Sequence, residues 1–120
     1  MTSTGSPAST AQVGTDRASR YGKQLVSHLS RRSAGAWDDD SGAGWIDFGE
    51  SRAELTAVPG ALHIRLSATP DRVAAMEDVV GRHLVRFGAR DELVVRWTRT
   101  DGTPGTIQRN DEGGEEGGEG

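Results

Sequence analysis

The sequence predicts an α+β fold, a two-layer sandwich with two helices on one face of a four-stranded, mainly antiparallel sheet, in the order α-β-β-β-α-β. Three observations support this prediction. Two segments carry apolar residues at helical spacing, and four short segments alternate apolar and polar residues as half-buried strands do. A Pro-Gly turn joins two of those strands. The chain has no cysteine, so no disulfide contributes to its stability.

Both predicted helices have an apolar stripe and a capping signal. The first is expected from Asp16, with Thr15 or Asp16 as its cap. The second is expected after Thr69, with Pro70 at its first position, and ends before Gly88. The two stripes consist of Ala18, Tyr21, Leu25, His28 and Leu29 in the first helix, and of Val73, Met76, Val80, His83, Leu84 and Phe87 in the second.

Four strands are predicted, over residues 45–48, 52–58, 61–67 and 93–97. Pro59-Gly60 fits the two central positions of a type II turn, so the second and third strands should form a hairpin. The last strand follows a helical crossover and is expected to run parallel to the third or the first. Residues 33–44 are expected to form a loop because glycine, serine and aspartate dominate them.

The chain ends differ from its middle in composition. Residues 1–15 and 100–120 lack hydrophobic periodicity, and we expect them to be disordered on either side of a single domain over residues 16–99. The acidic residues that make the net charge −4 lie mostly in these ends. The nearly neutral domain gives no electrostatic reason to expect nucleic acid or a membrane as partner. No targeting signal or membrane span is apparent, so a cytoplasmic location is expected.

Two histidines are the first candidate site. His28 and His83 both lie on the predicted inward stripes, and helices packed side by side would bring them together. With a carboxylate such as Glu77 or Asp78, they offer ligands for a transition metal or groups for acid–base catalysis. The structural alternative is that each imidazole hydrogen-bonds to a backbone carbonyl or an acid near a helix end. The sequence leaves both interpretations open and identifies no cofactor.

The sheet face opposite the helices is the second candidate site. Strand alternation places one aromatic and several charged side chains there, namely Trp45, Asp47, Arg52, Glu54, His63, Arg65, Val94 and Arg96. Ion pairs on a solvated face account for this pattern, and a homodimer interface is the alternative. The two acids dilute the positive field, so we do not expect nucleic acid on this face.

Several segments together resemble a known bacterial family. The matching pieces are Tyr21, Gln24-Leu25 and His28, then Gly44-Trp45-Ile46-Asp47-Phe48, Leu62-His63-Ile64-Arg65-Leu66, His83-Leu84-Val85-Arg86-Phe87 and the strand that ends at Trp97. Over about residues 17–99 the chain resembles the family called domain of unknown function 2218. Members typically have an apolar pair and then Arg-Glu where this chain has Gly88-Ala89-Arg90-Asp91.

The resemblance implies a small bacterial protein without an established activity, and it associates some members with siderophore-interacting flavoproteins. We therefore expect a cytoplasmic binding or accessory protein linked to iron or siderophore metabolism, with a pathway protein or a small ligand as partner. One alternative is an enzyme that uses His83 and His28 as acid–base or metal-ligand groups. Another is a homodimer that joins sheets through Trp45, Arg52, His63, Arg65 and Arg96.

Overall fold

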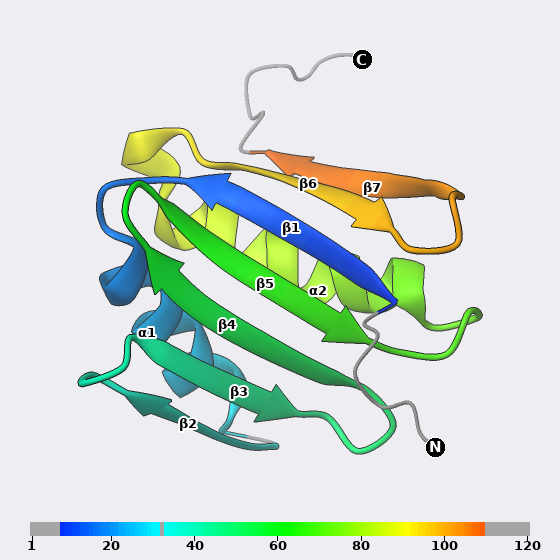
Figure 1. Cartoon of the computed structure of the whole chain (residues 1–120), viewed down its shortest axis with the longest axis horizontal. Helices are drawn as coiled ribbons and strands as arrows, with labels where there is room; N and C mark the ends of the chain where they lie inside the picture. The colour runs from blue at the N-terminus through cyan, green and yellow to red at the C-terminus, as the bar shows by residue number, and fades with distance from the viewer. Residues whose placement is uncertain (1–7, 32, 110–120) are drawn as a thin grey trace.

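A computed structural model describes residues 8–31 and 33–109 of the chain (Figure 1). Along the chain, the elements are β1 (Ser9–Gly14), α1 (Ala18–Leu29), β2 (Ala34–Asp38), β3 (Ala43–Asp47), β4 (Arg52–Val58), β5 (Ala61–Ser67), α2 (Val73–Phe87), the short 3₁₀ helix η1 (Ala89–Asp91), β6 (Val94–Arg99) and β7 (Pro104–Arg109).

The strands form one sheet in the order β2-β3-β4-β5-β1-β6-β7, and every neighbouring pair is antiparallel. Both helices lie on the same side of it (Figure 1). Helix α1 packs on β2 to β5, and α2 packs on β5, β6 and β7. The predicted α+β fold with two helices and an antiparallel sheet is thus confirmed. The predicted number of strands is wrong, because the sheet has seven rather than four.

Strand β1 is a central strand that the sequence analysis missed. It lies between β5 and β6, and its inward side chains Ser9, Ala11 and Val13 are buried. Serine and alanine are small and only weakly apolar, so the alternation in this segment does not stand out in the sequence. The position of β1 inside the sheet, and not its own hydrophobicity, therefore accounts for its burial.

The two edge strands were missed for different reasons. In β7 the buried side chain is Gln108, whereas Ile107 is 49% exposed, so the usual correspondence between apolar character and burial is reversed. Strand β2 is rich in glycine and alanine and pairs only with β3. Strand β2 and the turn that joins it to β3 lie in the segment predicted as a loop. Edge strands need little apolar surface, because only part of each faces the core.

These strands also move the predicted domain boundaries. Residues 9–14 and 104–109 belong to the sheet, so the boundaries at residues 16 and 99 lie too far inward. The predicted disorder of residues 1–7 and 110–120 lies outside the described residues. Within the described part of the chain, no helix is long and apolar enough to cross a membrane.

Local predictions were more accurate than the strand count. Strands β4 and β5 form the expected hairpin, with Val58 opposite Ala61 and with Gly60 at φ 81°, as a type II turn requires. Helix α1 begins at Ala18 and α2 at Val73, two to three residues after the predicted starts. Before α2, a turn carries residues 70–72, and the Val73 amide donates to the carbonyl of Thr69.

The strand that follows the α2 crossover runs in the predicted direction but pairs with a different neighbour. Strand β6 is antiparallel to β1, and β1 is antiparallel to β5, so β6 runs parallel to β5 as a helical crossover requires. It pairs with neither β5 nor β3, because β1 occupies the position beside β5. An N-terminal segment thus completes the middle of the sheet.

Candidate functional site

His28 of α1 and His83 of α2 lie side by side. Their ring centroids are 5.0 Å apart, with an angle of 43° between the ring planes. Phe87, one turn after His83, packs edge-on against His28 at 5.5 Å. The expectation that both imidazoles point into the core is wrong, because His28 is exposed and His83 is half-buried. They face each other across the helix pair because α1 and α2 pack side by side on the sheet.

The hydrogen bonds of the two rings differ. Nδ1 of His83 lies 2.7 Å from the carbonyl oxygen of Val79, one turn earlier. A carbonyl only accepts, so Nδ1 carries the proton, and the neutral ring keeps its lone pair on Nε2. The ring of His28 makes no hydrogen bond within the described residues. The structural interpretation of a histidine bonded to a backbone carbonyl thus applies to His83 only.

Glu77 does not join the histidine pair. Its carboxylate is fully buried and accepts hydrogen bonds from Ser9 Oγ at 2.7 Å, from Arg99 Nε and Nη2 at 3.0 Å, and from the amide and hydroxyl of Thr106 at 3.1 and 2.8 Å. Burial alone would raise the pKa of this carboxyl, but the hydrogen bonds outweigh burial and the pKa is lowered. Glu77 therefore acts as a structural link to β1, β6 and β7.

The acid of the family motif also has a partner that the sequence does not indicate. Asp91 accepts a hydrogen bond from the hydroxyl of Tyr21 at 2.5 Å, and this bond, together with burial, raises the pKa of the tyrosine. Both residues stood out only as pieces of a motif, 70 positions apart. Their contact connects the first turn of α1 to η1 and explains why a carboxylate is useful at position 91.

A basic groove runs beside His28. It has a volume of about 420 Å³, and its lining residues are Arg20, Lys23, Gln24, Ser27, His28, Arg31 and Phe87. Lys23 is paired with Asp39 at 3.4 Å across exposed surface. No carboxylate is among the described residues that line the groove, so these residues give it a positive charge.

The predicted sheet-face residues do share one face. Trp45, Glu54 and Arg65 are consecutive cross-strand neighbours on β3, β4 and β5. The guanidinium of Arg52 lies 4.7 Å from the centroid of the Trp45 ring and pairs with Glu54 at 3.4 Å. Ion pairing and cation–π contact therefore occupy the β3–β4 half of this face, in line with the prediction of ion pairs on a solvated face.

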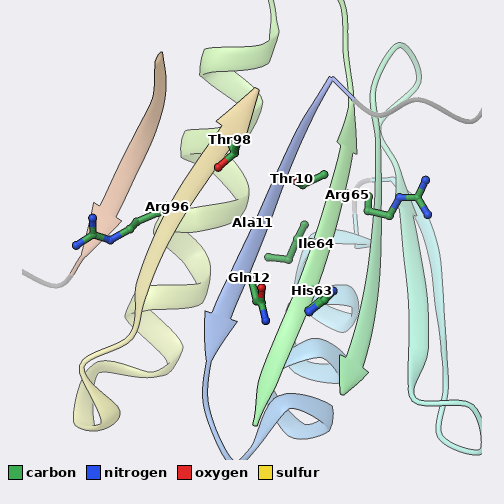
Figure 2. A pocket seen from close by; sticks show the side chains of 8 residues that line it. All are labelled: Thr10, Ala11, Gln12, His63, Ile64, Arg65, Arg96 and Thr98. Atoms are coloured by element: carbon green, nitrogen blue, oxygen red, sulfur yellow. The ribbon is translucent and has the colours of Figure 1, made fainter. Parts of the chain in front are cut away.

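The other half of the face contains a shallow depression of about 540 Å³ (Figure 2). We call this the sheet-face depression, and its lining residues are Thr10, Ala11, Gln12, His63, Ile64, Arg65, Arg96 and Thr98. Gln12 and His63 are cross-strand partners and lie side by side, while Arg65 extends toward β4 and Arg96 toward β7 (Figure 2).

Sequence reasoning found three of these lining residues and missed the middle of the depression. His63, Arg65 and Arg96 were predicted on this face, whereas Thr10 and Gln12 belong to the missed strand β1. The alternation of Thr10 and Gln12 with the buried Ser9, Ala11 and Val13 was the feature of the sequence that could have identified this strand. Among the described residues, the titratable side chains that line the depression are His63, Arg65 and Arg96, and none is a carboxylate.

The chain is similar to a bacterial protein family and to a solved structure. The model of a family described as uncharacterised protein conserved in bacteria (DUF2218) matches residues 10–98. The chain is also similar to PA4090 from Pseudomonas aeruginosa, whose structure was solved by NMR. The sequence identity is 33% and the TM-score is 0.61, over 75% of this chain and 93% of PA4090. No significant match was found among curated proteins.

Proposed function

The chain belongs to the DUF2218 family of bacterial proteins, and we propose that it is a small binding or accessory protein that holds an anionic ligand in the sheet-face depression. The observation that carries this proposal is the lining itself. Its long side chains are hydrogen-bond donors or cations, and among the described residues that line it there is no carboxylate. Planar guanidinium groups pair with carboxylates and phosphates in a bidentate manner.

Arg96 is the lining cation with no ion-pair partner within the described residues. Its side chain is exposed and extends toward β7 at the rim of the depression (Figure 2). Thr10, Gln12 and Thr98 add neutral donors between Arg96 and Arg65. Since these side chains come from the three adjacent strands β5, β1 and β6, a rigid sheet holds them in position.

Binding is favoured over catalysis by the same geometry. Within the described residues, no hydroxyl of the depression is hydrogen-bonded to His63, the contact that would activate a nucleophile. Ala11 and Ile64 line the depression through their backbone, because their side chains are buried in the core on the helix side of the sheet. The side chains that face the depression are therefore polar or charged, which suits recognition of a ligand.

A role in iron or siderophore metabolism is part of this proposal, and family resemblance is its support. Iron chelates with carboxylate or catecholate donors are anionic, so the basic lining suits that class of ligand. Citrate, ferric citrate and inorganic phosphate are practical probes because they share negative charge but differ in size and metal content.

The test is a titration of each probe into the full chain at about 0.15 M ionic strength, followed by amide chemical shifts in NMR. We expect the amides of Thr10, Gln12 and Thr98 to shift, and Arg96→Gln to weaken binding about three- to tenfold. Arg86→Gln is the matched control, because it removes the same charge from an exposed site on α2. Tighter binding of ferric citrate than of citrate would support the iron link.

Two results would contradict the proposal. One is an equal loss of affinity in both arginine variants, which would indicate a general charge effect. The other is a dimer at micromolar concentration that Arg65→Glu dissociates and that binds none of the three probes. That second result would favour the homodimer, which uses the same face.

A further inference from the structure

We propose that His28 and His83 form a second site, separate from the sheet-face depression, which binds a divalent transition metal ion through two imidazoles. The two histidines belong to α1 and α2, which lie on one side of the sheet (Figure 1), whereas outward side chains of β5, β1 and β6 line the depression on the other face. The residues and the test of this second site are independent of the anion site, so either proposal can fail alone.

The spacing of the rings is the first argument. Two imidazole nitrogens that share a metal at about 2.0 to 2.1 Å place their ring centroids roughly 4.5 to 5.2 Å apart, for right-angle to tetrahedral coordination. The observed separation is 5.0 Å. The ring separation is therefore compatible with two imidazole nitrogens that share one ion.

The proton positions are the second argument. The bond from Nδ1 of His83 to the Val79 carbonyl leaves Nε2 as the metal-binding atom. Metal-bound histidines typically donate their other ring N–H in this way, which fixes the ring and its tautomer. His28 has no competing hydrogen bond within the described residues, so either of its nitrogens is available.

The packing around the rings limits their motion. Phe87 contacts both imidazoles, with centroid distances of 5.5 Å to His28 and 6.5 Å to His83. Near its other end, α1 is also bonded to η1, the segment that follows α2, where Tyr21 donates to Asp91. A pair held in this way loses less conformational entropy when it binds a metal.

The surroundings indicate what completes the coordination. No group of three or more histidine, aspartate or glutamate side chains is arranged to hold a metal in the described part of the chain. Glu77 is bonded to Arg99, and Asp78 is paired with Arg82 at 2.9 Å. Since no described side chain completes the coordination, we infer that water or a small anion does so, and the basic groove beside His28 favours an anion.

The ligand type points to Cu²⁺, Ni²⁺ or Zn²⁺. Imidazole nitrogen suits these ions, and the affinity of such sites is greatest for Cu²⁺. Positive charge from Arg20 and Arg31 opposes a bare cation and favours an anion as a further ligand of the ion.

A titration of Cu²⁺ into the full chain, monitored by electron paramagnetic resonance, tests the site. We expect one strong site with hyperfine coupling to two imidazole nitrogens. His28→Ala and His83→Ala should each weaken it at least about tenfold. His63→Ala is the matched control, since it removes the remaining histidine of the chain, on the other face of the sheet, and should leave binding unchanged.

A double variant makes the result decisive. If both rings hold the same ion, the wild type should bind one ion with coupling to two nitrogens, each single variant should keep coupling to one nitrogen at most, and His28→Ala/His83→Ala should lose this site altogether. Two ions per wild-type chain, with one remaining in each single variant at unchanged affinity, would show two separate sites and overturn the proposal. Wild-type affinity in either single variant, or an equal loss in His63→Ala, would overturn it as well. Circular dichroism of each variant confirms that the fold is retained, which is expected because His28 is exposed and His83 half-buried.

Discussion

Glu77 is the residue that ties the missed strands to the rest of the molecule. It is fully buried, and its partners Ser9, Arg99 and Thr106 lie on β1, β6 and β7. Arg99 is itself only 15% exposed at its side chain. A buried carboxylate is tolerated because hydrogen bonds and an opposite charge replace its lost hydration.

We expect the Glu77→Gln variant to be less stable at pH 7 by about 3 kcal/mol or more, because it leaves Arg99 buried beside a neutral amide. The folded state lowers the pKa of Glu77 from its ordinary value of 4.5. The charged form therefore stabilises the fold above about pH 4.5, and this contribution is lost as the pH falls through the folded-state pKa.

Urea unfolding of wild type and Glu77→Gln between pH 7 and pH 3 measures both effects. The acid-induced loss of stability should be smaller in the variant. Asp78→Asn is the control, because its carboxylate forms only an exposed pair with Arg82, and it should change stability by less than about 0.5 kcal/mol. Equal pH profiles for wild type and Glu77→Gln would contradict this role.

Among the elements, α2 contains a glycine that its contact with the edge strand β7 requires. A Cβ atom at Gly81 would lie 2.0 Å from Oε1 of Gln108, so the glycine lets this strand approach the helix. Oε1 of Gln108 accepts the indole N–H of Trp97 at 2.7 Å, and its amide donates to Thr106 at 2.8 Å. Gln108 thus has a fixed position that it cannot leave without breaking both bonds.

Helix α1 also contains a glycine at a close contact with a strand side chain. A Cβ at Gly22 would lie 2.6 Å from the indole ring of Trp37, a side chain of β2. Glycine lowers helix propensity, so its place inside α1 needs a reason. The structure gives the reason for the residue, which is contact with a side chain from a strand that was not predicted.

We expect Gly81→Ala to destabilise the protein by about 1 to 3 kcal/mol, although alanine is favoured over glycine inside a helix by about 1 kcal/mol. The clash with Gln108 outweighs the propensity. Thermal unfolding followed by circular dichroism measures the change. In a Gln108→Ala background the clash is absent, and the same substitution should become neutral or stabilising. A higher melting temperature for Gly81→Ala alone would contradict the argument.

At the scale of the whole molecule, β1 joins two halves of the sheet. It is the neighbour of both β5 and β6, so β2 to β5 and β6 to β7 are connected through it. Its inward residues Ala11 and Val13 belong to the same core as Leu25 of α1 and Val80 of α2. The backbone groups of both neighbouring strands depend on this strand for their hydrogen bonds.

We expect a chain that lacks residues 1–14 to lose cooperative unfolding, because removal of β1 leaves β5 and β6 with unpaired edges and opens the core. Differential scanning calorimetry and the near-ultraviolet circular dichroism of the tryptophans would measure this loss. A chain that lacks only residues 1–7 is the control, since it keeps β1 whole. A native-like transition in the shorter chain would show that β1 is dispensable.

Much of the helix layer and the central hairpin was predictable from the sequence. Their signals are local, since apolar periodicity marked α1 and α2 and the Pro-Gly turn marked the β4–β5 hairpin. The candidate site was predictable at the level of single residues. His28, His83, His63, Arg65 and Arg96 were all identified as candidates, and their residue types carry the chemistry of both proposals.

By itself, the sequence determined which segments can bury an apolar face, the hairpin turn, the residue types at both sites and the bacterial family. Only the tertiary structure decided that β1 enters the middle of the sheet, that Glu77 is bonded to Arg99, and that His28 meets His83. The physical reason is that burial and proximity depend on neighbours far away in the chain. Ser9 and Gln108 are buried because partners bond to them, although their own polarity predicts exposure.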